Sequence, residues 1–551
     1  MTANVTEGRA PEWKYQRQFD HGEGVSTRTR RASLVVEKEP VLLDDERMRF
    51  FLANGYLTLT PQLPASFHQD MFDRFLELAG DDNDANPGNN LLPVVPEMSL
   101  IFEDPVVKGA LTSVLGDGYM MHPHRVLHDN PPGSDAQVWH HDSYWGYKRK
   151  VHNHHPWWVM IMYYPQEIFE KIGPTGVIPG SQCIAQRLED IDQLGTPAEG
   201  QAGTCMMIHY DIWHRKMKNF TNLKRFMTKF EFIRMHRPDR VTWDNTNPDW
   251  QAPASPPAYD MEPVWRAHWY WISHKPLPQP DVKPTADIAD AMSRLNDEDR
   301  RVRARAASDL ARYGADAVEA IPALVNSLGD DSEPVGLNAG YALAAIGEVA
   351  IPALIEAMRG NDGENVDDAR CFIDEGQKSE IEMVARNAAH GLVAVGKPAV
   401  PALVEVALTA GPRVRKYASF ALGEIDTDDD VVLNVLGENA RHPDPAVRIN
   451  AVEALGLKRG TDRTVEILAQ ALDDEDDEVR FNAALSLARL GPTAAPAVAA
   501  LTHSLTDGNR YVTGYALEAL ERIGTAEATN VLMRMLKIGR WCPMTNNKSL
   551  F

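Results

Sequence analysis

The second half of the chain repeats one pattern of apolar and polar positions. Seven phrases such as YALAAIG (341–347) and LSLARLG (485–491) place leucine and alanine at helical spacing. Their central leucines lie about 33 residues apart, except for one step of 49 residues that coincides with a polar stretch (360–378). Each unit predicts two amphipathic helices, which bury their apolar faces only by stacking on neighbouring units. These leucines are Leu310, Leu343, Leu392, Leu422, Leu455, Leu487 and Leu520.

The openings of the repeated units are equally regular. DPAVR (444–448) and DDEVR (476–480) share the order Asp-x-x-Val-Arg, which resembles HEAT-type (PBS-lyase-like) repeats. An ordinary helical bundle is the alternative, but it needs no period of 33 residues. We therefore expect an α-solenoid of about seven HEAT-like repeats over 286–538, with the polar stretch as an inserted loop.

The first half has a mixed pattern that predicts strands as well as helices. FHQDMFDRFLELAG (67–80) is typical of a helix, and FFLANGYLTLT (50–60) predicts a helix that ends at Gly55 and continues into a short strand. From about 119 to 235 the pattern predicts short strands separated by turn signals such as NPPG, GPTG and IPGS. Many short strands without long helices between them favour a β-barrel or jelly roll. The predicted strands are 119–128, 137–145, 157–164, 203–213 and 225–235.

The join between the halves is rich in proline and carries five tryptophans. Proline prevents regular backbone ladders, whereas so many large rings indicate packing rather than a free linker. We expect an ordered strap or linker there. The chain then divides into an N-terminal extension (1–44), a β domain (45–240), the strap (241–285), the repeat domain (286–538) and a C-terminal tail (539–551).

Composition and charge narrow the classes of function. The net charge of −22 argues against a nucleic-acid partner, since binding phosphates needs a basic face. No apolar run approaches the roughly 20 residues of a membrane span, and the N-terminus lacks the apolar core of a secretory signal. The four cysteines are scattered and form no CxxC pair, which indicates a reducing compartment. We expect a cytoplasmic protein without a membrane partner.

Candidate metal ligands begin with the pattern His-x-Asp. On a strand, residues two apart share a face and can reach one ion, whereas on a helix they diverge by roughly 200°. His140/Asp142 fits best, because strand-like residues surround it and His214 follows in the same region. His209/Asp211 also lies on a predicted strand but lacks a suitable third histidine. The other two pairs, His68/Asp70 and His442/Asp444, lie in a predicted helix and in a turn between repeats.

Two imidazoles and one carboxylate favour a particular metal chemistry. They occupy one face of an octahedral ion and leave three positions open, as in the facial triad of non-haem Fe(II) oxygenases. A structural zinc site instead closes all four of its positions, usually with cysteine. No cysteine is close in sequence to His140, Asp142 or His214.

The first half also resembles the phytanoyl-CoA dioxygenase family across about residues 45–235. The resemblance rests on WHHDSYW (139–145), GVIPGSQ (176–182) and a long motif with family spacing. It implies a double-stranded β-helix that binds Fe(II) through His140, Asp142 and His214 and 2-oxoglutarate through Arg225 and Asn219. A guanidinium suits a carboxylate, with which it forms two parallel hydrogen bonds. The long motif comprises Gly203, His209, His214, Asn219 and Arg225.

The chain departs from the family pattern at three places. Thr204 stands where the family has aspartate, Arg215-Lys216-Met217-Lys218 replaces a glycine-rich stretch, and Asn130 stands where a lysine is common. These departures bear on contacts to substrate and co-substrate rather than on the iron ligands.

The resemblance implies a dioxygenase that uses Fe(II), 2-oxoglutarate and O2 to hydroxylate or desaturate a small organic metabolite. Asp142 favours these reactions over halogenation, because related halogenating enzymes have a small residue at that position. The repeats would serve protein interaction or substrate recruitment. The alternatives are a scaffold or adaptor that binds partners on its repeats, a protein hydroxylase, and a non-catalytic β-barrel with a structural metal.

Further polar residues have two interpretations each. The remaining histidines of the β region could orient the metal ligands or bind substrate, or they could have no role. The basic residues Lys148, Arg149, Lys150, Lys216 and Lys218 could attract an anionic substrate or form a solvated face. The histidines are His122, His124, His128, His141, His152, His154 and His155.

Overall fold

The computed structural model describes residues 39–79, 87–142, 149–280, 287–360 and 380–538. From Pro40 onward the chain belongs to one compact unit. The predicted inserted loop and C-terminal tail, most of the N-terminal extension, and Lys148 lie outside the described residues. The predicted limits of the five segments stay predictions.

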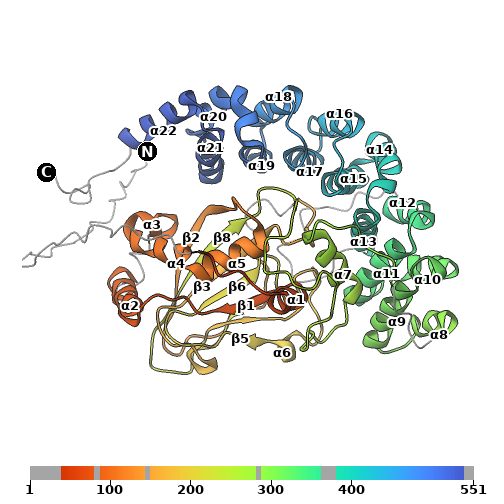
Figure 1. Cartoon of the computed structure of the whole chain (residues 1–551), viewed down its shortest axis with the longest axis horizontal. Coiled ribbons are helices and arrows are strands. Elements are labelled where there is room, and N and C mark those ends of the chain that lie inside the picture. The colour runs from red at the N-terminus through yellow and green to blue at the C-terminus, as the bar shows by residue number, and fades with distance from the viewer. Residues whose placement is uncertain (1–38, 80–86, 143–148, 281–286, 361–379, 539–551) are drawn as a thin grey trace, which may run out of the picture. The chain divides into compact units, whose positions relative to one another are not determined.

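Two antiparallel sheets lie in the first half (Figure 1). The larger has the strand order β1-β6-β3-β8-β2 and the smaller the order β5-β4-β7. Two sheets are what the predicted double-stranded β-helix requires, and their closure into a jelly roll stays a prediction. The strands are β1 (Tyr56–Leu59), β2 (Met120–Asn130), β3 (Trp158–Tyr163), β4 (Thr175–Val177), β5 (Thr196–Pro197), β6 (Cys205–His209), β7 (His214–Lys216) and β8 (Arg225–Ile233).

Helices near the N-terminus cover one face of the larger sheet. The predicted helices at 67–80 and before Gly55 are confirmed as α2 and α1, and Gly55 takes the left-handed conformation (φ 77°) that ends α1 before β1. The helices of the first half are α1 (Asp45–Asn54), α2 (Ala65–Ala79), α3 (Leu91–Val94), α4 (Ser99–Glu103), α5 (Pro105–Leu115), α6 (Ile191–Leu194) and α7 (Glu262–Ile272), with the short 3-10 turns η1 (Gly88–Asn90), η2 (Pro96–Met98) and η3 (Glu170–Ile172).

Strand β8 shows how alternation sorts side chains between the two faces of this sheet. Phe226 and Phe230 pack against phenylalanines of α2 and α4. Arg225, Lys229 and Glu231 alternate with them and therefore lie on the opposite face. All nine residues of β8 are buried, so these three charged groups lie inside the protein.

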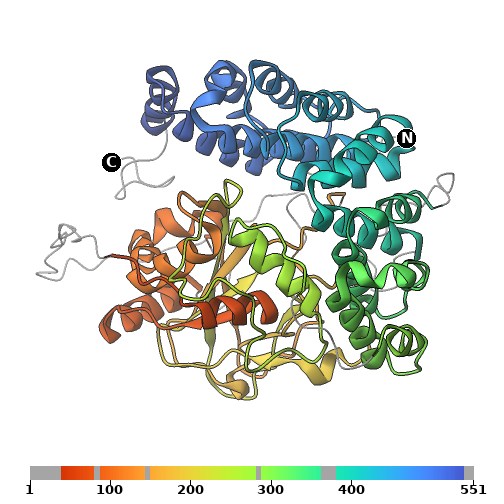
Figure 2. The same ribbon diagram turned by 45° about the vertical axis from the view of Figure 1, so that its right-hand side comes forward.

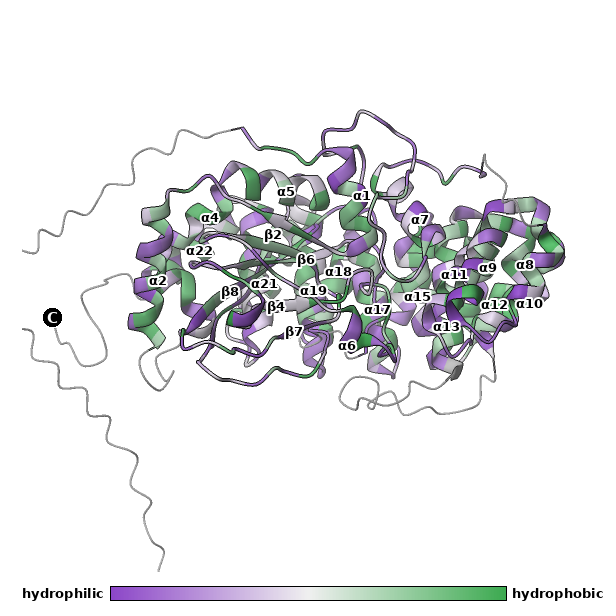
Figure 3. Ribbon diagram, turned by 90° about the horizontal axis from the view of Figure 1, so that it is seen from below, coloured by the Kyte–Doolittle hydropathy of each residue, from purple (hydrophilic) through white to green (hydrophobic). Residues whose placement is uncertain are grey.

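The second half is a stack of helix pairs, as predicted. An inner row runs through α9, α11, α13, α15, α17, α19 and α21, and the alternate helices form an outer row. Figure 3 shows hydrophobic and hydrophilic residues mixed along these helices, as amphipathic repeats require. The helices are α8 (Ile288–Arg294), α9 (Arg300–Tyr313), α10 (Ile321–Ser327), α11 (Glu333–Ile346), α12 (Ile351–Arg359), α13 (Glu380–Val395), α14 (Val400–Thr409), α15 (Pro412–Glu424), α16 (Asp430–Asn439), α17 (Pro445–Gly456), α18 (Asp462–Ala471), α19 (Asp477–Leu490), α20 (Val498–Ser504), α21 (Arg510–Ile523) and α22 (Ala526–Ile538), with the 3-10 turns η4 (Gly314–Ala320), η5 (Glu348–Ala350), η7 (Lys397–Ala399) and η8 (Gly491–Ala497).

The Asp-x-x-Val-Arg openings have a direct structural role. Asp444 and Asp476 accept hydrogen bonds from the first backbone N–H groups of α17 and α19, so each caps a helix. The arginine of each opening reaches the turn of the next repeat, where Arg448 holds Asp474 through two bonds of 2.9 and 2.8 Å. Arg480 holds Asp507 in the same way. The repeated motif thus fixes both the start of a helix and its spacing from the next repeat.

By length and composition alone, the helical run Asp477–Ser504 could cross a membrane. It joins α19, η8 and α20, and 61% of its apolar window is buried inside the protein. Such burial is what the core helices of a repeat stack require.

The inner row of repeat helices packs against the first half, as Figures 1 and 2 show. Arg149 donates two hydrogen bonds to Asp476, of 2.6 and 2.9 Å, and Lys150 pairs with Glu453. Further along, His155 contacts Glu424 at 2.7 Å. The basic run is therefore neither a solvated face nor a free anion site at Arg149 and Lys150, because acidic repeat residues bind both.

Glu518 on α21 makes this packing sensitive to pH. Burial, reinforced by Glu521, raises the pKa of Glu518 from 4.5 to about 7 against the opposing effect of Arg522 and Arg125. The folded state then holds the Glu518 proton more tightly than the unfolded state does. The stability that the protonated Glu518 contributes is complete below pH 4.5 and is lost as the pH rises to about 7. We expect Glu518→Gln to stabilise the chain by about 1–3 kcal/mol at pH 8 and hardly at all at pH 5.

Urea unfolding of both chains at the two pH values measures this difference. Glu521→Gln is the matched control, because Glu521 is exposed and only adds to the shift. An identical pH dependence in the Glu518→Gln and parent chains would show that Glu518 titrates normally.

Candidate metal centre

The structure brings His140, Asp142 and His214 together. One possible ligand atom from each lies within 4.8 Å of the others. The Nε2 atoms of His140 and His214 are 3.9 and 3.5 Å from the two carboxylate oxygens of Asp142. Their rings lie 4.6 Å apart between centroids. Two imidazoles and a carboxylate at these distances can bind one ion without a change of fold.

The strand predicted over 137–145 is described only as far as Asp142, and residues 143–145 lie outside the described residues. Among its described residues only His140 forms a bridge, in which its backbone exchanges two hydrogen bonds of 3.0 Å with His214. Over 137–142 the prediction was therefore wrong in extent, because the neighbouring strand β7 (His214–Lys216) is only three residues long. The single bridge still sets the two histidines side by side.

Backbone carbonyls orient both rings. Nδ1 of His140 lies 2.9 Å from the carbonyl of Val138, and Nδ1 of His214 lies 3.0 Å from that of Ile212. A ring nitrogen that faces a carbonyl carries the proton, so Nε2 keeps its lone pair for an ion. Burial and the neighbouring His214 lower the pKa of His140, which favours the neutral ligand form.

Lys229 is a buried partner of Asp142 that the sequence did not reveal. Its Nζ lies 2.6 Å from a carboxylate oxygen of Asp142, and its side chain is 8% exposed. Burial alone would raise the pKa of Asp142, but the Lys229 ammonium and the His214 ring hold it well below its usual value. The only signal in the sequence was the alternation of β8, which places Lys229 on the same face as Arg225.

Arg225 is fully buried with part of its guanidinium unpaired. Its Nε and Nη2 donate to the carbonyl of Gly173 at 3.1 and 3.0 Å, whereas Nη1 has no hydrogen-bond partner among the residues that the structure describes. Gly173 takes a positive φ of 69°, and a Cβ there would collide with Asn130 and Met217. A buried cation with a free donor favours an anion beside it, because leaving the charge unpaired costs free energy.

Asn219 lies in the turn that precedes β8. Its amide nitrogen donates to the carbonyls of Asn130 and Leu223, and its amide oxygen accepts hydrogen bonds from Thr221. These contacts explain asparagine at this position by the turn that it holds. A direct contact with the co-substrate stays a prediction.

Three other histidines of this half, His122, His152 and His68, have partners other than the three ligands. His122 faces Glu231 at 3.0 Å, and His152 faces Asp211 at 3.1 Å. Asp211 therefore belongs to a separate pair and, with His209, forms no metal cluster among the described residues. His68 lies on α2 and contacts Tyr163.

His128 shows that the charged groups share one buried interior. Burial lowers its pKa to about 3, with further effects from Lys229, Asp142, Arg225 and His214. His128 is consequently neutral at physiological pH. Two of the candidate ligands, Asp142 and His214, lie close enough to act on this ring together with Arg225 and Lys229.

Comparison with known families gives a separate match in each half of the chain. Residues 67–227 match the model of the family described as phytanoyl-CoA dioxygenase (PhyH). Residues 288–370 and 433–520 match HEAT repeats. None of the curated proteins compared with the chain matches it.

Solved structures give weaker likenesses. An engineered protein is 22% identical, with 45% of this chain and 71% of that chain covered and a TM-score of 0.27. EctD from S. alaskensis is 16% identical, with coverages of 38% and 84% and a TM-score of 0.31. The non-heme alpha ketoglutarate dependent carbocyclase SnoK from nogalamycin biosynthesis is 13% identical, with coverages of 36% and 88% and a TM-score of 0.29. TM-scores this low carry no argument about this chain.

Proposed function

We propose that this chain, which matches the phytanoyl-CoA dioxygenase family over residues 67–227 and HEAT repeats in its second half, is an Fe(II)- and 2-oxoglutarate-dependent dioxygenase. Its substrate would be a small organic metabolite that is hydroxylated or desaturated. The observation that carries the proposal is the pairing of two features in one interior. His140, Asp142 and His214 converge as an open set of ligands, and Arg225 offers an unpaired Nη1 to an anion.

Each of these residues has a distinct task. His140, Asp142 and His214 would hold the iron, and Arg225 would bind the distal carboxylate of 2-oxoglutarate. Lys229 keeps Asp142 ionised, which is the form that binds a metal. Iron with 2-oxoglutarate, when bound, supplies the activation of O2. The protein positions the reactants, keeps the ligands in the correct protonation state and excludes water.

A purely structural metal explains less. A structural zinc ion closes its four positions with protein ligands and needs no anion beside it. It would leave the buried Nη1 of Arg225 without a function. The oxygenase proposal accounts for both features.

We further propose that the protein works in a reducing, cytoplasmic compartment. We also propose that the repeats pack against the domain that contains the metal site. Cys183 and Cys205 are free and buried, which fits a reducing compartment. The inner row of helices packs on the first half. A protein partner, in the adaptor or protein hydroxylase alternatives, would therefore meet the outer row.

Loss of Arg225 tests the proposed co-substrate site. We expect Arg225→Ala to raise the KM for 2-oxoglutarate by about 10–100-fold, because hydrogen bonds to a charged group are lost. The kcat should change less, since the metal ligands remain. Succinate release at varied 2-oxoglutarate concentration separates the two constants.

Lys224→Ala is the matched control for this prediction. It removes a cation one position away, which pairs with Asp129 at 3.6 Å rather than with the interior. Equal rises in KM for both variants would indicate a general loss of charge and would contradict the assignment. Anaerobic titration of Fe(II) protein with 2-oxoglutarate, followed by its visible charge-transfer band, checks binding directly.

A further inference from the structure

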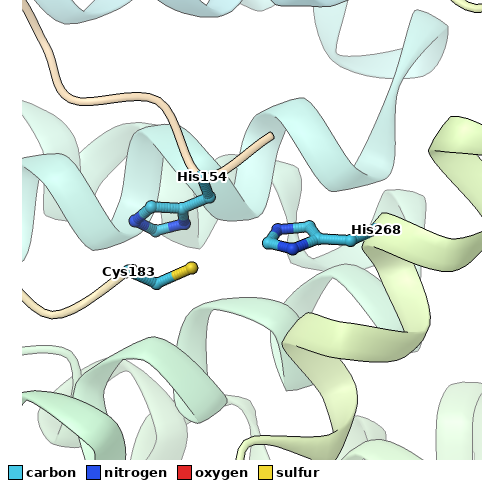
Figure 4. Close-up of side chains that lie close together, drawn as sticks. All are labelled: His154, Cys183 and His268. Atoms are coloured by element: carbon cyan, nitrogen blue, oxygen red, sulfur yellow. The ribbon is translucent and has the colours of Figure 1, made fainter. Parts of the chain in front are cut away.

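A second cluster of possible metal ligands lies apart from the first. It consists of His154 before β3, Cys183 after β4 and His268 on α7, and Figure 4 shows the three side chains turned toward one another. One ligand atom from each lies within 4.8 Å of the others, and all three residues are at most 4% exposed. Two of them come from loops and the third from a helix, so the fold brings them together across 114 residues of sequence.

We infer that His154, Cys183 and His268 bind a second metal ion, of the zinc class. Two imidazoles and a thiolate form a donor set of borderline softness, which suits Zn²⁺. The set contains no carboxylate, so it suits neither Ca²⁺ nor Mg²⁺. It also differs from the His140, Asp142 and His214 set, whose hard oxygen donor suits Fe(II).

The alternative is a buried cluster held by hydrogen bonds alone. The hydroxyl of Tyr341 lies 3.2 Å from Nδ1 of His154 and 3.5 Å from Nε2 of His268. These contacts occupy the histidines but leave the sulfur of Cys183 without a hydrogen bond among the described residues. Cys205, the second buried thiol among the described residues, donates to the carbonyl of Gly203 at 3.9 Å. A metal ion would give Cys183 the partner that its environment lacks.

The surroundings keep the histidines in the form that binds metals. Burial, with His390 and Arg386 close by, lowers the pKa of His154 well below its usual value, and burial with nearby histidines does the same for His268. His154 also stacks on His390 of α13 with 3.3 Å between ring centroids, an arrangement that two charged rings would not tolerate. The neutral imidazoles bind an ion without first losing protons, whereas burial raises the pKa of the Cys183 thiol, which therefore releases its proton only when the ion binds.

An ion at this place would join parts of the chain that are far apart in sequence. It would tie the segment before β3 and the loop after β4 to α7. Tyr341 on α11 and His390 on α13 contact the same cluster from the repeat side. Because such a site forms only in the folded chain, binding would stabilise the contact between the two halves.

Cobalt is the probe that tests the second site. In full-length chain carrying His140→Ala, which disables the first site, we expect Co²⁺ to give a thiolate-to-cobalt charge-transfer band that saturates at one equivalent and disappears when Zn²⁺ is added. The band should be lost in the same chain with Cys183→Ser and retained with Cys205→Ser. Because the readout is spectroscopic, its result does not depend on the proposed oxygenase activity.

Three outcomes would overturn the inference. They are a folded His140→Ala chain without the band, a band that survives Cys183→Ser, and a band that Cys205→Ser removes. If Cys183→Ser does not fold, X-ray absorption of the zinc-loaded His140→Ala chain decides. Sulfur among the zinc neighbours supports the site, and a shell of nitrogen and oxygen alone refutes it.

Discussion

Asp142→Ala should abolish 2-oxoglutarate turnover. The change removes the only carboxylate of the proposed iron site, and the two histidines that remain bind Fe(II) weakly. Loss of a residue that merely supports a metal ligand already costs about 10–100-fold in affinity or activity, so loss of the ligand should cost at least that much. Succinate release and the iron content of the purified chain are the measurements.

Two further variants separate loss of metal from loss of fold. Asp142→Ala leaves the Lys229 ammonium buried without its partner at 2.6 Å, which is itself destabilising. The double variant Asp142→Ala/Lys229→Met removes that charge and should regain stability but not iron. Asp211→Ala is the matched control, because Asp211 is a buried aspartate of a second His-x-Asp pair and contacts His152 instead. Iron-dependent turnover that persists in Asp142→Ala would refute the proposed site.

Local patterns predicted much of this molecule because they depend on near neighbours in the chain. Helical spacing and a period of about 33 residues indicated the stacked repeats, and the Asp-x-x-Val-Arg opening uses contacts within one repeat or with the next. His140 and Asp142 are two residues apart, so an extended backbone alone places both on one face. His214 was a candidate because it follows in the same region and fits the family motif, since nothing local pairs segments 72 residues apart.

Lys229 could not be predicted in the same way. Its partner Asp142 is 87 residues away, and a lysine in an alternating strand is more often exposed to solvent. The cluster of His154, Cys183 and His268 was hidden for a similar reason, since its members lie on separate elements and form no spaced motif. Both depend on how the sheets and α7 pack, which the alternation of apolar residues does not specify.

The packing of the repeats on the first half could not be predicted from the sequence either. A basic run such as Arg149-Lys150 has the same appearance whether it faces water, an anionic substrate or another part of the chain. Its acidic partners Asp476 and Glu453 follow more than 300 residues later. Part of the negative charge of the repeats thus serves contact with the first half rather than solvation.

Deletion of residues 286–551 should leave the first half unable to fold stably. The hydrophobic core continues from the first half into the repeats. The inner face of the larger sheet and the repeat helices belong to one continuous cluster of buried apolar residues. Trp157 and Trp265 are 3% and 1% exposed, and they pack with Arg489 and Leu337 of the repeats. Each large side chain returned to water costs about 1.5–3 kcal/mol, so a few of them equal the roughly 5–15 kcal/mol that stabilises a typical protein.

Soluble yield, circular dichroism and succinate release measure the outcome for the truncated chain. We expect aggregation and no turnover, whereas a chain that ends before α22 should stay soluble and active, because α22 packs on α20 and α21 rather than on the first half. A folded, active fragment of residues 1–285 would contradict this expectation and would make the repeats a separable module for partner binding. The difference between the two truncations therefore distinguishes repeats that complete the core of the first half from repeats that only accompany it.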